Sequence, residues 1–433
     1  MKILIINAGS SSVKFTCMES DDNSSLAKGL VERIGLKGTS FVYKRADGME
    51  LKREIDIKTT RQAVDLITSS LVDETSGVIG HLSEIKAVGH RIVHGGEKIT
   101  TPVLIDEDVK AVIDECAELA PLHNPPNLEG IMACEDVLPG VPQVGVFDTA
   151  FHTTMPSRAY LYGIPLQLYQ AYRVRRYGFH GTSHKYVHQK AIRYFDRDIR
   201  ELKIITCHLG NGCSISAVEG VRCIDTSMGF TPLEGLMMGT RCGDIDAAVI
   251  FFLMDRKNMS AGQVSEMLNR KSGLLGLAGI GSSDLRDIEA KVKEGHREAS
   301  SCFDAFCYRI RKYIGSYIAA MEGVDGIVFT GGIGENSDMV RARVCGGLEK
   351  LGIVLDVERN RAFRQMEGEI HKPESAVKIL VIPTNEEAEI ARETLKVISG
   401  HYGEVLRIPN YHSQMSDFSD IDQPMNHLIA QTS

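Results

Sequence analysis

Two arginines framed by glycines are the residues of this sequence best suited to chemistry on a small anion. Arg91 stands in residues 89–96 (GHRIVHGG), and Arg241 stands in residues 239–244 (GTRCGD). An arginine binds a carboxylate or a phosphate through two parallel N–H groups, and glycines let a ligand approach the backbone. A lone arginine is usually a surface residue, but this repeated context predicts an anion site.

A carboxylate and a histidine could serve the same site. Asp148 follows the apolar run 144–147, and α/β proteins place ligand-facing groups at such strand ends. Asp148 could instead cap the next segment. His180 lies in residues 176–184 (RYGFHGTSH), where two glycines bracket Phe-His, and its N–H can stabilise negative charge in a transition state.

Glycine-containing turns are the candidates for holding a nucleotide, because the common phosphate motifs are missing. The sequence contains no G-x-x-x-x-G-K-[ST], and no G-x-G-x-x-G follows a strand. Residues 7–14 (NAGSSSVK) offer backbone N–H groups, hydroxyls and Lys14 to phosphates, or form an ordinary hairpin turn. Residues 208–212 (HLGNG) are a second such turn, and residues 328–336 (VFTGGIGEN) suit an adenosine packed against the backbone.

Asn7 and the acidic pair Glu386 and Glu387 are the candidates for a metal site. Residues 383–387 (PTNEE) place both glutamates in the first turn of a predicted helix, where the helix dipole alone would favour them. The alternative is that one glutamate binds Mg²⁺, usually through water, while Asn7 holds a metal-bound water.

The elements that must position these residues alternate between short β-rich runs and longer helical patterns, which predicts parallel sheets covered by helices. We expect strands at residues 3–6, 87–90, 144–147, 203–207, 326–330 and 378–382. We expect helices at residues 60–72, 106–119, 183–195, 261–269, 300–321 and 386–397. The longest apolar run, residues 247–254, is expected to be a core segment.

An internal repeat indicates two related domains. Residues 3–17 (ILIINAGSSSVKFTC) and 204–218 (IITCHLGNGCSISAV) both read as strand, glycine-containing turn and return strand. A chain of 433 residues is also long for one core. The predicted fold is α/β, with a domain at 1–150 completed by a helix at 386–398, a nucleotide-binding domain at 151–385, and a tail at 403–433 without chemistry. Paired hairpins of this kind resemble the actin, sugar-kinase and Hsp70 superfold, whose ribonuclease H-like domains face a nucleotide cleft.

Composition excludes several other classes of function. The net charge of −8 argues against nucleic acid as the main partner, although basic residues gather between 173 and 185. No apolar run approaches the roughly 20 residues that a membrane helix needs. The ten cysteines are scattered without any Cys-x-x-Cys, which favours reduced core thiols and a cytoplasmic location.

The segments NAGSSSVK, GHRIVHGG, FDTAFH, RYGFHGTSH, HLGNG, GTRCGDID, GGIGEN and PTNEE resemble those of the acetate kinase family, in the family's order and from Met1 to about Val397. The resemblance implies direct, in-line transfer of the ATP γ-phosphoryl group to acetate, giving acetyl phosphate. It implies that Arg91 and Arg241 flank the carboxylate and the phosphoryl group, and that His180 donates to the phosphoryl oxygens. Asp148 would orient this arrangement or the metal's water. Asn7 and Glu386 would hold Mg²⁺ or Mn²⁺.

The resemblance also implies the remaining contacts and the assembly. The pocket for the methyl group would be formed by Val93, Leu122, Phe179 and Pro232. The nucleotide would be bound by Lys14, His208, Leu209, Gly210, Asn211, Gly212, Asp284, Leu285, Arg286, Gly332, Ile333, Gly334, Glu335 and Asn336. Leu285 departs from the aromatic residue of some members, which puts the packing of adenine in doubt. A homodimer is a property of the family and is not visible in the sequence.

Three alternatives remain open. A propionate or butyrate kinase resembles this chain throughout, but propionate kinases tend to have a smaller residue in place of Val93. A kinase that uses pyrophosphate would close the adenosine pocket. A non-catalytic nucleotide switch, as in actin-like filaments, would not need two glycine-framed arginines and His180.

Overall fold

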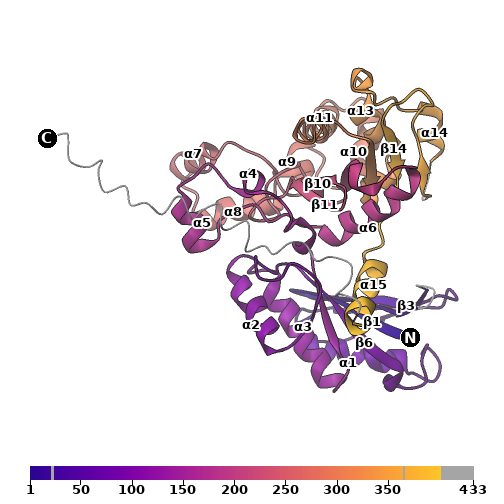
Figure 1. Cartoon of the computed structure of the whole chain (residues 1–433). Helices are drawn as coiled ribbons and strands as arrows, with labels where there is room; N and C mark the ends of the chain where they lie inside the picture. The colour runs from indigo at the N-terminus through magenta and orange to yellow at the C-terminus, as the bar shows by residue number, and fades with distance from the viewer. Residues whose placement is uncertain (21–23, 364–365, 401–433) are drawn as a thin grey trace, which may run out of the picture.

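The computed structural model describes residues 1–20, 24–363 and 366–400, so the predicted tail at 403–433 lies outside the described residues. The described residues form two lobes, each built on one sheet (Figure 1). The first sheet has eight strands: β1 (Lys2–Gly9), β2 (Ser12–Glu19), β3 (Ser25–Glu32), β4 (Ser40–Arg45), β5 (Glu50–Glu54), β6 (Ile85–Ile92), β7 (Val103–Leu104) and β8 (Gln143–Phe147). The second has six strands: β9 (Lys203–Leu209), β10 (Cys213–Glu219), β11 (Arg222–Thr226), β12 (Gly326–Thr330), β13 (Gly368–Glu369) and β14 (Lys378–Val381).

The two sheets repeat one strand order. The run β3-β2-β1-β6-β8 in the first sheet corresponds to β11-β10-β9-β12-β14 in the second. In each run the hairpin strands pair antiparallel, and the last three strands pair parallel. The predicted α/β fold of two related domains is therefore confirmed, and the repeated hairpins are β1–β2 and β9–β10.

Helices cover both sheets. Those of the first lobe are α1 (Thr60–Leu71), α2 (Glu107–Glu115) and α3 (Asn124–Val137). Those that follow along the chain are α4 (Ser157–Tyr160), α5 (Leu166–Tyr172), α6 (Gly181–Ala191), α7 (Ala248–Lys257), α8 (Ala261–Arg270), α9 (Gly273–Leu277), α10 (Leu285–Lys293), α11 (Arg297–Ala320), α12 (Gly331–Asn336), α13 (Asp338–Cys345), α14 (Val357–Ala362) and α15 (Glu386–Ile398).

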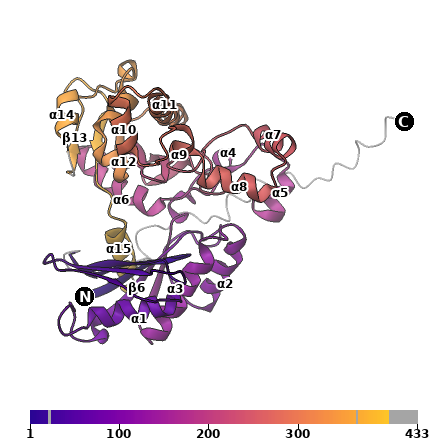
Figure 2. The ribbon, with the colours of Figure 1, turned by 180° about the vertical axis from the view of Figure 1, so that it is seen from behind.

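Two helices cross between the lobes. Helix α6 follows the first sheet in the chain but packs on β9 and β12 of the second, while α15 follows the second sheet and packs on β1, β6 and β8 of the first. The two helices contact each other, and both lie at the junction of the lobes in Figures 1 and 2. This exchange brings residues from the end of the chain beside the first strand.

The apolar run 247–254 is not a core segment, so that prediction was wrong. It forms most of α7, which has no buried residue, and Phe251 and Phe252 are 69% and 58% exposed. A run without polar residues has no polar face, so its pattern cannot tell burial within one chain from burial against another. Helix α7 lies with α5 at the outer end of the upper lobe, in both Figure 1 and Figure 2.

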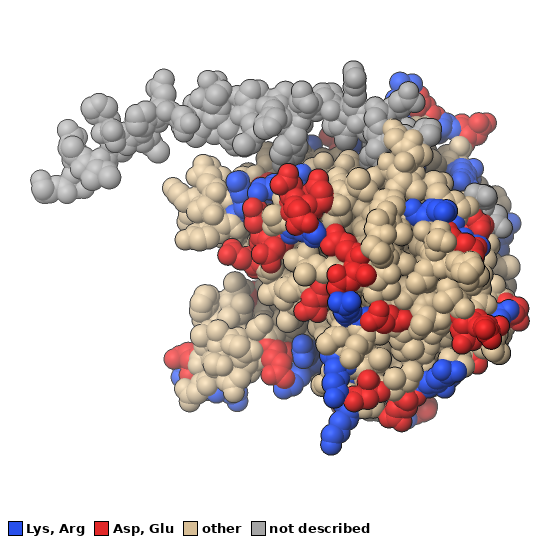
Figure 3. Space-filling model, turned by 90° about the horizontal axis from the view of Figure 1, so that it is seen from below, with Lys and Arg blue, Asp and Glu red and all other residues tan. Residues whose placement is uncertain are grey.

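One face of the molecule carries charges of both signs. Figure 3 shows Lys and Arg side chains in small groups among Asp and Glu side chains over one face of the molecule. No helix of the described residues is long and apolar enough to cross a membrane.

Candidate active site

Arg91 and Asp148 meet where two parallel strands end. Arg91 lies near the end of β6 and Asp148 directly follows β8, whose Phe147 is the register partner of Ile92. An Nη of Arg91 donates to the Asp148 carboxylate at 2.5 Å, and the Thr182 hydroxyl donates to its other oxygen at 3.1 Å. Asp148 is 1% exposed, so its role in this geometry is to fix the guanidinium of Arg91.

Arg91 also faces the start of α15. Its Nε lies 3.8 Å from a carboxylate oxygen of Glu386, and its Nη1 donates to the Asn7 amide oxygen at 3.5 Å. Burial lowers the pKa of Arg91, but the charges of Asp148 and Glu386 outweigh it, so the pKa is raised. Arg91 is therefore a permanent cation held between the carboxylates of Asp148 and Glu386.

A pocket of about 250 Å³ opens beside this arginine. Its polar lining comes from both ends of the chain, namely Asn7, Lys14, Thr16, Arg91, Thr384, Glu386 and Glu387, and its apolar lining is Ile5, Phe15 and Ile390. Lys14 and Glu387 form an ion pair across it. Burial, joined by the nearby charges of Asp148 and Glu387, raises the pKa of Glu386 to about 7 despite Arg91.

The donors of this pocket fit a magnesium ion. Mg²⁺ prefers oxygen ligands, keeps several waters and takes its other ligands from substrate phosphates, so one amide and one carboxylate suffice. Asn7 and Glu386, predicted as its ligands, line the same pocket because α15 returns to the first sheet.

His180 approaches from the other lobe, at the start of α6. Its backbone is left-handed, with φ of 57°, which is costly for a residue with a side chain and persists only where the surrounding structure holds it. The next residue, Gly181, donates its N–H to the Asp148 carbonyl at 3.0 Å. A Cβ at position 181 would lie 2.1 Å from that carbonyl oxygen, so only glycine allows α6 to start here.

Arg241 shares a small space with His180. Its Nη1 donates to the Pro232 carbonyl at 2.7 Å. A Cβ on Gly212 would lie 2.7 Å from the Arg241 Nη2 and 3.3 Å from the His180 Nε2, so both groups point at the same place above this glycine. Burial lowers the pKa of His180 well below its usual value, and the charges of both arginines lower it further. His180 is therefore neutral, and it lies close enough to Arg91 and Arg241 for their charges to lower its pKa.

Only some of the residues predicted to form the apolar pocket for the methyl group lie together in the structure. Val93 and Phe179 are 6% and 3% exposed and belong to one buried cluster, and Pro232 joins the site through its bond to Arg241. Leu122 is 61% exposed and lies outside that cluster. The next residue, His123, has its pKa lowered by burial and by the charges of Arg91 and Arg241, so this turn lies near the site.

Of the residues predicted to bind the nucleotide, some lie at the surface and others are buried in the core. The ring of His208 stacks on His180 at 4.4 Å, and Asn211 is exposed in the turn that follows. Leu209 and Leu285 are buried in the core cluster, so their side chains cannot reach the surface. Asp284 caps α10 and pairs with Arg286 at 2.5 Å.

The glycine-rich turn after β12 forms the short helix α12. Gly332 and Asn336 are exposed, Ile333 is half-buried, and Gly334 is buried. The Glu335 carboxylate accepts the backbone N–H groups of Gly331 at 2.9 Å and Thr384 at 3.1 Å. Glu335 thus ties the predicted adenosine turn to the segment that leads into α15.

Sequence reasoning missed two buried asparagines of α3. The Asn127 side chain accepts the Val93 N–H at 3.0 Å and donates to the Ala8 carbonyl at 2.7 Å. Asn124 is fully buried and bonds both the N–H and the carbonyl of His94. Together they hold the strand end that carries Arg91, and the residues 123–127 (HNPPN) are the signal that could have found them.

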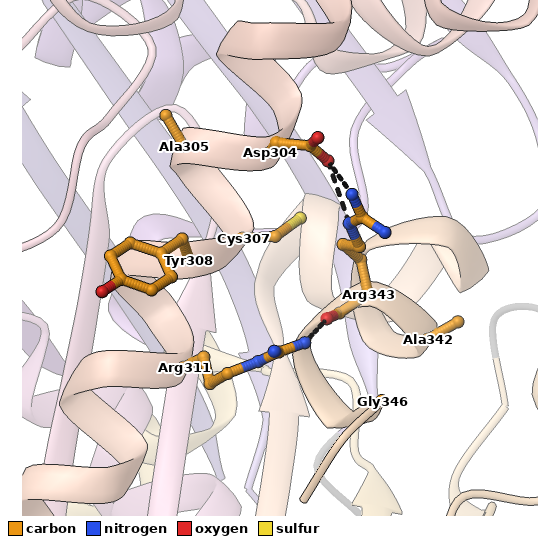
Figure 4. Close-up of a pocket in the computed structure, with 8 residues that line it drawn as sticks. All are labelled: Asp304, Ala305, Cys307, Tyr308, Arg311, Ala342, Arg343 and Gly346. Carbon is orange, nitrogen blue, oxygen red and sulfur yellow. Dashed lines mark hydrogen bonds and ion pairs between the residues drawn. The ribbon is translucent and has the colours of Figure 1, made fainter.

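Two further groups of basic side chains have partners within the protein. The basic residues between 173 and 185 are paired: Arg175 with Glu97, Arg176 with Glu234, and Lys185 with Glu393. A larger pocket of about 590 Å³ lies between α11 and α13 (Figure 4). Its arginines are committed, because Arg343 bonds Asp304 and Arg311 bonds backbone carbonyls of α13.

Two related lobes with anchored arginines, a neutral histidine and a polar pocket at their junction define a two-domain kinase. A family model described as the acetokinase family matches residues 2–392. The acetate kinase of Carboxydothermus hydrogenoformans is 53% identical over 398 residues, which cover 92% of this chain and 99% of that protein. The acetate kinase of Methanosarcina thermophila is 50% identical, with coverage of 92% and 97%.

Solved structures agree. The Porphyromonas gingivalis acetate kinase matches with a TM-score of 0.89 and 48% identity, covering 92% of this chain and 99% of that one. A propionate kinase from Francisella tularensis matches with a TM-score of 0.85 and 40% identity, at the same coverage. This chain belongs to the acetokinase family, as its motifs predicted.

Proposed function

We propose that this protein transfers the γ-phosphoryl group of ATP to acetate, reversibly, giving ADP and acetyl phosphate. The single observation that best supports this is that two anchored arginines, one from each lobe, both act by their charge on a neutral histidine that lies beside Arg241. Such a set suits a small carboxylate beside a transferring phosphoryl group, because both are anions that need several fixed donors.

The residues act by position and charge. Phosphoryl transfer passes through a loose transition state whose charge lies on the equatorial oxygens, so catalysis is mostly alignment and neutralisation. Arg91, held by Asp148, and Arg241, held by Pro232, flank the acetate carboxylate and the phosphoryl group. His180 donates its N–H to the equatorial oxygens.

The nucleotide lies between the lobes. Lys14 and the turn from His208 to Gly212 bind its phosphates, while Asp284, Arg286 and the segment from Gly332 to Asn336 surround the adenosine. The exposed Gly332 supports this, because a Cβ there would meet nothing within 4 Å and the surface is open for a flat base.

Asn7 and Glu386 hold Mg²⁺, and Mn²⁺ is an acceptable substitute at such oxygen ligands. The ion neutralises phosphate charge when it is bound. The pocket that these two residues share with Lys14 supports the assignment.

The activity is tested by incubating the protein with ATP, Mg²⁺, acetate and hydroxylamine, which traps acyl phosphate. We expect an acetohydroxamate signal that needs both ATP and acetate. ATP turnover without hydroxamate, or no turnover, would contradict the proposal and favour a nucleotide switch.

A propionate kinase is the second candidate, since one methylene discriminates by only about 1–3 kcal/mol in an apolar pocket. Val93 favours acetate, because it is buried in the same cluster as Phe179 and a smaller residue there would leave more room for a longer acyl chain. Measuring kcat/KM for acetate, propionate and butyrate side by side decides between the two.

We also propose that residues 1–150 with the helix 386–398 form one domain and residues 151–385 the other. The ten cysteines are free, and this fits a reducing compartment such as the cytoplasm.

We propose that the protein is a homodimer, with the exposed side of α7 and α5 as its interface. The exposed apolar residues there are Ile164, Leu166, Leu168, Tyr172, Ile245, Val249, Phe251, Phe252 and Met254. Contiguous apolar patches of this kind are uncommon on monomers and typical of protein interfaces. A second copy presents the same face, so a two-fold interface would cover both.

Light scattering after gel filtration tests this assembly. The wild-type chain of 47.6 kDa should elute as a dimer, and Phe251→Asp with Phe252→Asp should elute as a monomer. The matched control is Tyr308→Asp, which charges an aromatic that is 59% exposed on α11, away from this face. A monomeric wild type, or an unchanged dimer in the double variant, would reject the interface.

A further inference from the structure

A line of hydrogen-bonded side chains runs behind His180. The His180 Nδ1 lies 2.8 Å from the Ser214 hydroxyl, which lies 2.7 Å from the Nε2 of His184. The Nδ1 of His184 lies 2.7 Å from the Thr206 hydroxyl. The line therefore reads Thr206, His184, Ser214, His180.

The line is built into the rigid part of the second lobe. Thr206 lies on β9 and Ser214 on β10, which pair antiparallel, and His184 lies on α6, one turn after His180. Thr206, His184 and Ser214 are all fully buried. The hydrogen bonds among these three side chains are therefore made out of contact with bulk solvent.

Both histidines are neutral. Burial lowers the pKa of His180 and of His184 well below the usual value, and neighbouring histidines add to this. A neutral imidazole has one N–H donor and one acceptor nitrogen, so each ring must donate on one side and accept on the other. The line therefore has a single direction along its whole length.

Thr206 sets that direction. Across the described residues, the Thr206 hydroxyl has no hydrogen-bond partner besides His184. If it accepted from His184, its own buried proton would have no acceptor, which costs more than an unused lone pair. Thr206 thus donates to the Nδ1 of His184, whose Nε2–H donates to Ser214, whose hydroxyl donates to the Nδ1 of His180.

The proton of His180 must then lie on Nε2, which is the nitrogen beside Gly212 and Arg241. We propose that Thr206, His184 and Ser214 are positioning residues that hold His180 in the Nε2–H tautomer, ready to donate to the transferring phosphoryl group. The inference about the tautomer rests on the hydrogen bonds, and its use in catalysis rests on the proposed function.

A neighbouring branch offers a matched control. The Nδ1 of His208, whose ring stacks on His180, bonds the Ser183 hydroxyl at 2.8 Å, and Ser183 lies 2.7 Å from the Thr384 hydroxyl. Ser183→Ala removes a serine partner of a stacked histidine without touching the line to His180.

Nitrogen NMR of the ¹⁵N-histidine-labelled protein without substrates tests the tautomer directly. We expect His180, assigned by its loss in His180→Asn, to show one protonated Nε2 and an Nδ1 that accepts a hydrogen bond. Ser214→Ala should move the His180 Nδ1 resonance to that of an unbonded nitrogen, and Ser183→Ala should move only His208. A His180 protonated on Nδ1, or unchanged in Ser214→Ala, would overturn the proposal, and the wild-type spectrum decides even if a variant does not fold.

Kinetics test what the tautomer does. We expect Ser214→Ala and Thr206→Val to lower kcat about tenfold or more, as loss of an orienting partner does, with KM changed about twofold or less. Unchanged kcat in both variants would overturn the catalytic role. An inactive wild type with the Nε2–H tautomer would instead reject the proposed function and leave the tautomer assignment standing.

Discussion

The hairpins β1–β2 and β9–β10 hold the same place in the two sheets but differ in character. In the first, Asn7 lies opposite Lys14, whose side chain is 53% exposed and paired with Glu387. In the second, His208 lies opposite Ser214, which is fully buried and bonded to two histidines. The first hairpin therefore presents an exposed, charged side chain, and the second presents a buried, neutral one.

The difference corresponds to two tasks that a kinase must combine. A polyphosphate and its metal enter and leave, so they need charged groups in an open pocket that water can refill. A transition state needs donors whose orientation is fixed beforehand, and burial with neutral partners provides this. In the proposed function, the two hairpins therefore share a backbone arrangement but differ in the character of their inward side chains.

The largest effect should come from the arginines, one per lobe. Arg91→Lys and Arg241→Lys keep the charge but lose the planar pair of donors, so we expect kcat to fall about 10²–10³-fold. Binding of ADP, measured by calorimetry, should change little. If either lysine variant kept a near wild-type kcat, that arginine would not contact the transferring group.

Much of this site could be predicted from the sequence because its residues sit in local motifs. Arg91 lies near the end of β6, Asp148 directly follows β8 and His180 directly precedes α6, and parallel strands end on one edge. Contacts across the chain could not be predicted, because they depend on register and crossing. The Asn127 bond to Val93 and the Glu335 bond to Thr384 are of this kind.

The character of a surface could not be predicted either. An apolar run gives the same pattern whether it faces its own core or another molecule, and α7 shows the result. Basic residues 173–185 likewise gave no hint that their partners lie on other elements.

The next largest effect tests the proposed Mg²⁺ site beside the first hairpin. Glu386→Ala should raise the Mg²⁺ concentration needed for half-maximal kcat about 10-fold or more, because one of the ion's few protein contacts is lost. Glu387→Ala is the matched control: its carboxylate pairs with Lys14, so it should change the Mg²⁺ requirement much less. Equal Mg²⁺ curves for the two variants would remove the distinction between the adjacent glutamates.

Acid should destabilise the folded protein through its buried neutral histidines, of which His208 lies on the second hairpin and His152 lies outside it. Burial lowers the pKa of His152 and of His208 to about 4, while an unfolded histidine titrates near 6.5. The unfolded state therefore binds more protons between pH 6.5 and 4, so stability is full above 6.5 and falls as the pH drops. Each such histidine should remove about 1.4 kcal/mol per pH unit, measured by urea unfolding.

His152→Gln should flatten this pH dependence relative to the wild type, even if its stability at pH 7 is lower. The control is His81→Gln, at an exposed position of the first lobe, which should leave the slope unchanged. A slope that is the same in all three proteins would mean that His152 does not titrate differently in the folded state.

The smallest effect concerns a place where, among the described residues, the two lobes share a core. Val93 leaves the first sheet at the end of β6 but packs with Phe179 in the core cluster of the second lobe. Val93→Ala should open space beside the acetate methyl group and raise the propionate-to-acetate ratio of kcat/KM about tenfold, since a methylene is worth little over 1 kcal/mol in such a pocket. The matched control is Ile92→Val, which trims the preceding residue in a cluster confined to the first lobe. If Val93→Ala and Ile92→Val both left the ratio unchanged, the pocket would not include Val93. If both raised the ratio equally, the change would reflect looser packing of the strand end, because Ile92 faces away from the shared core.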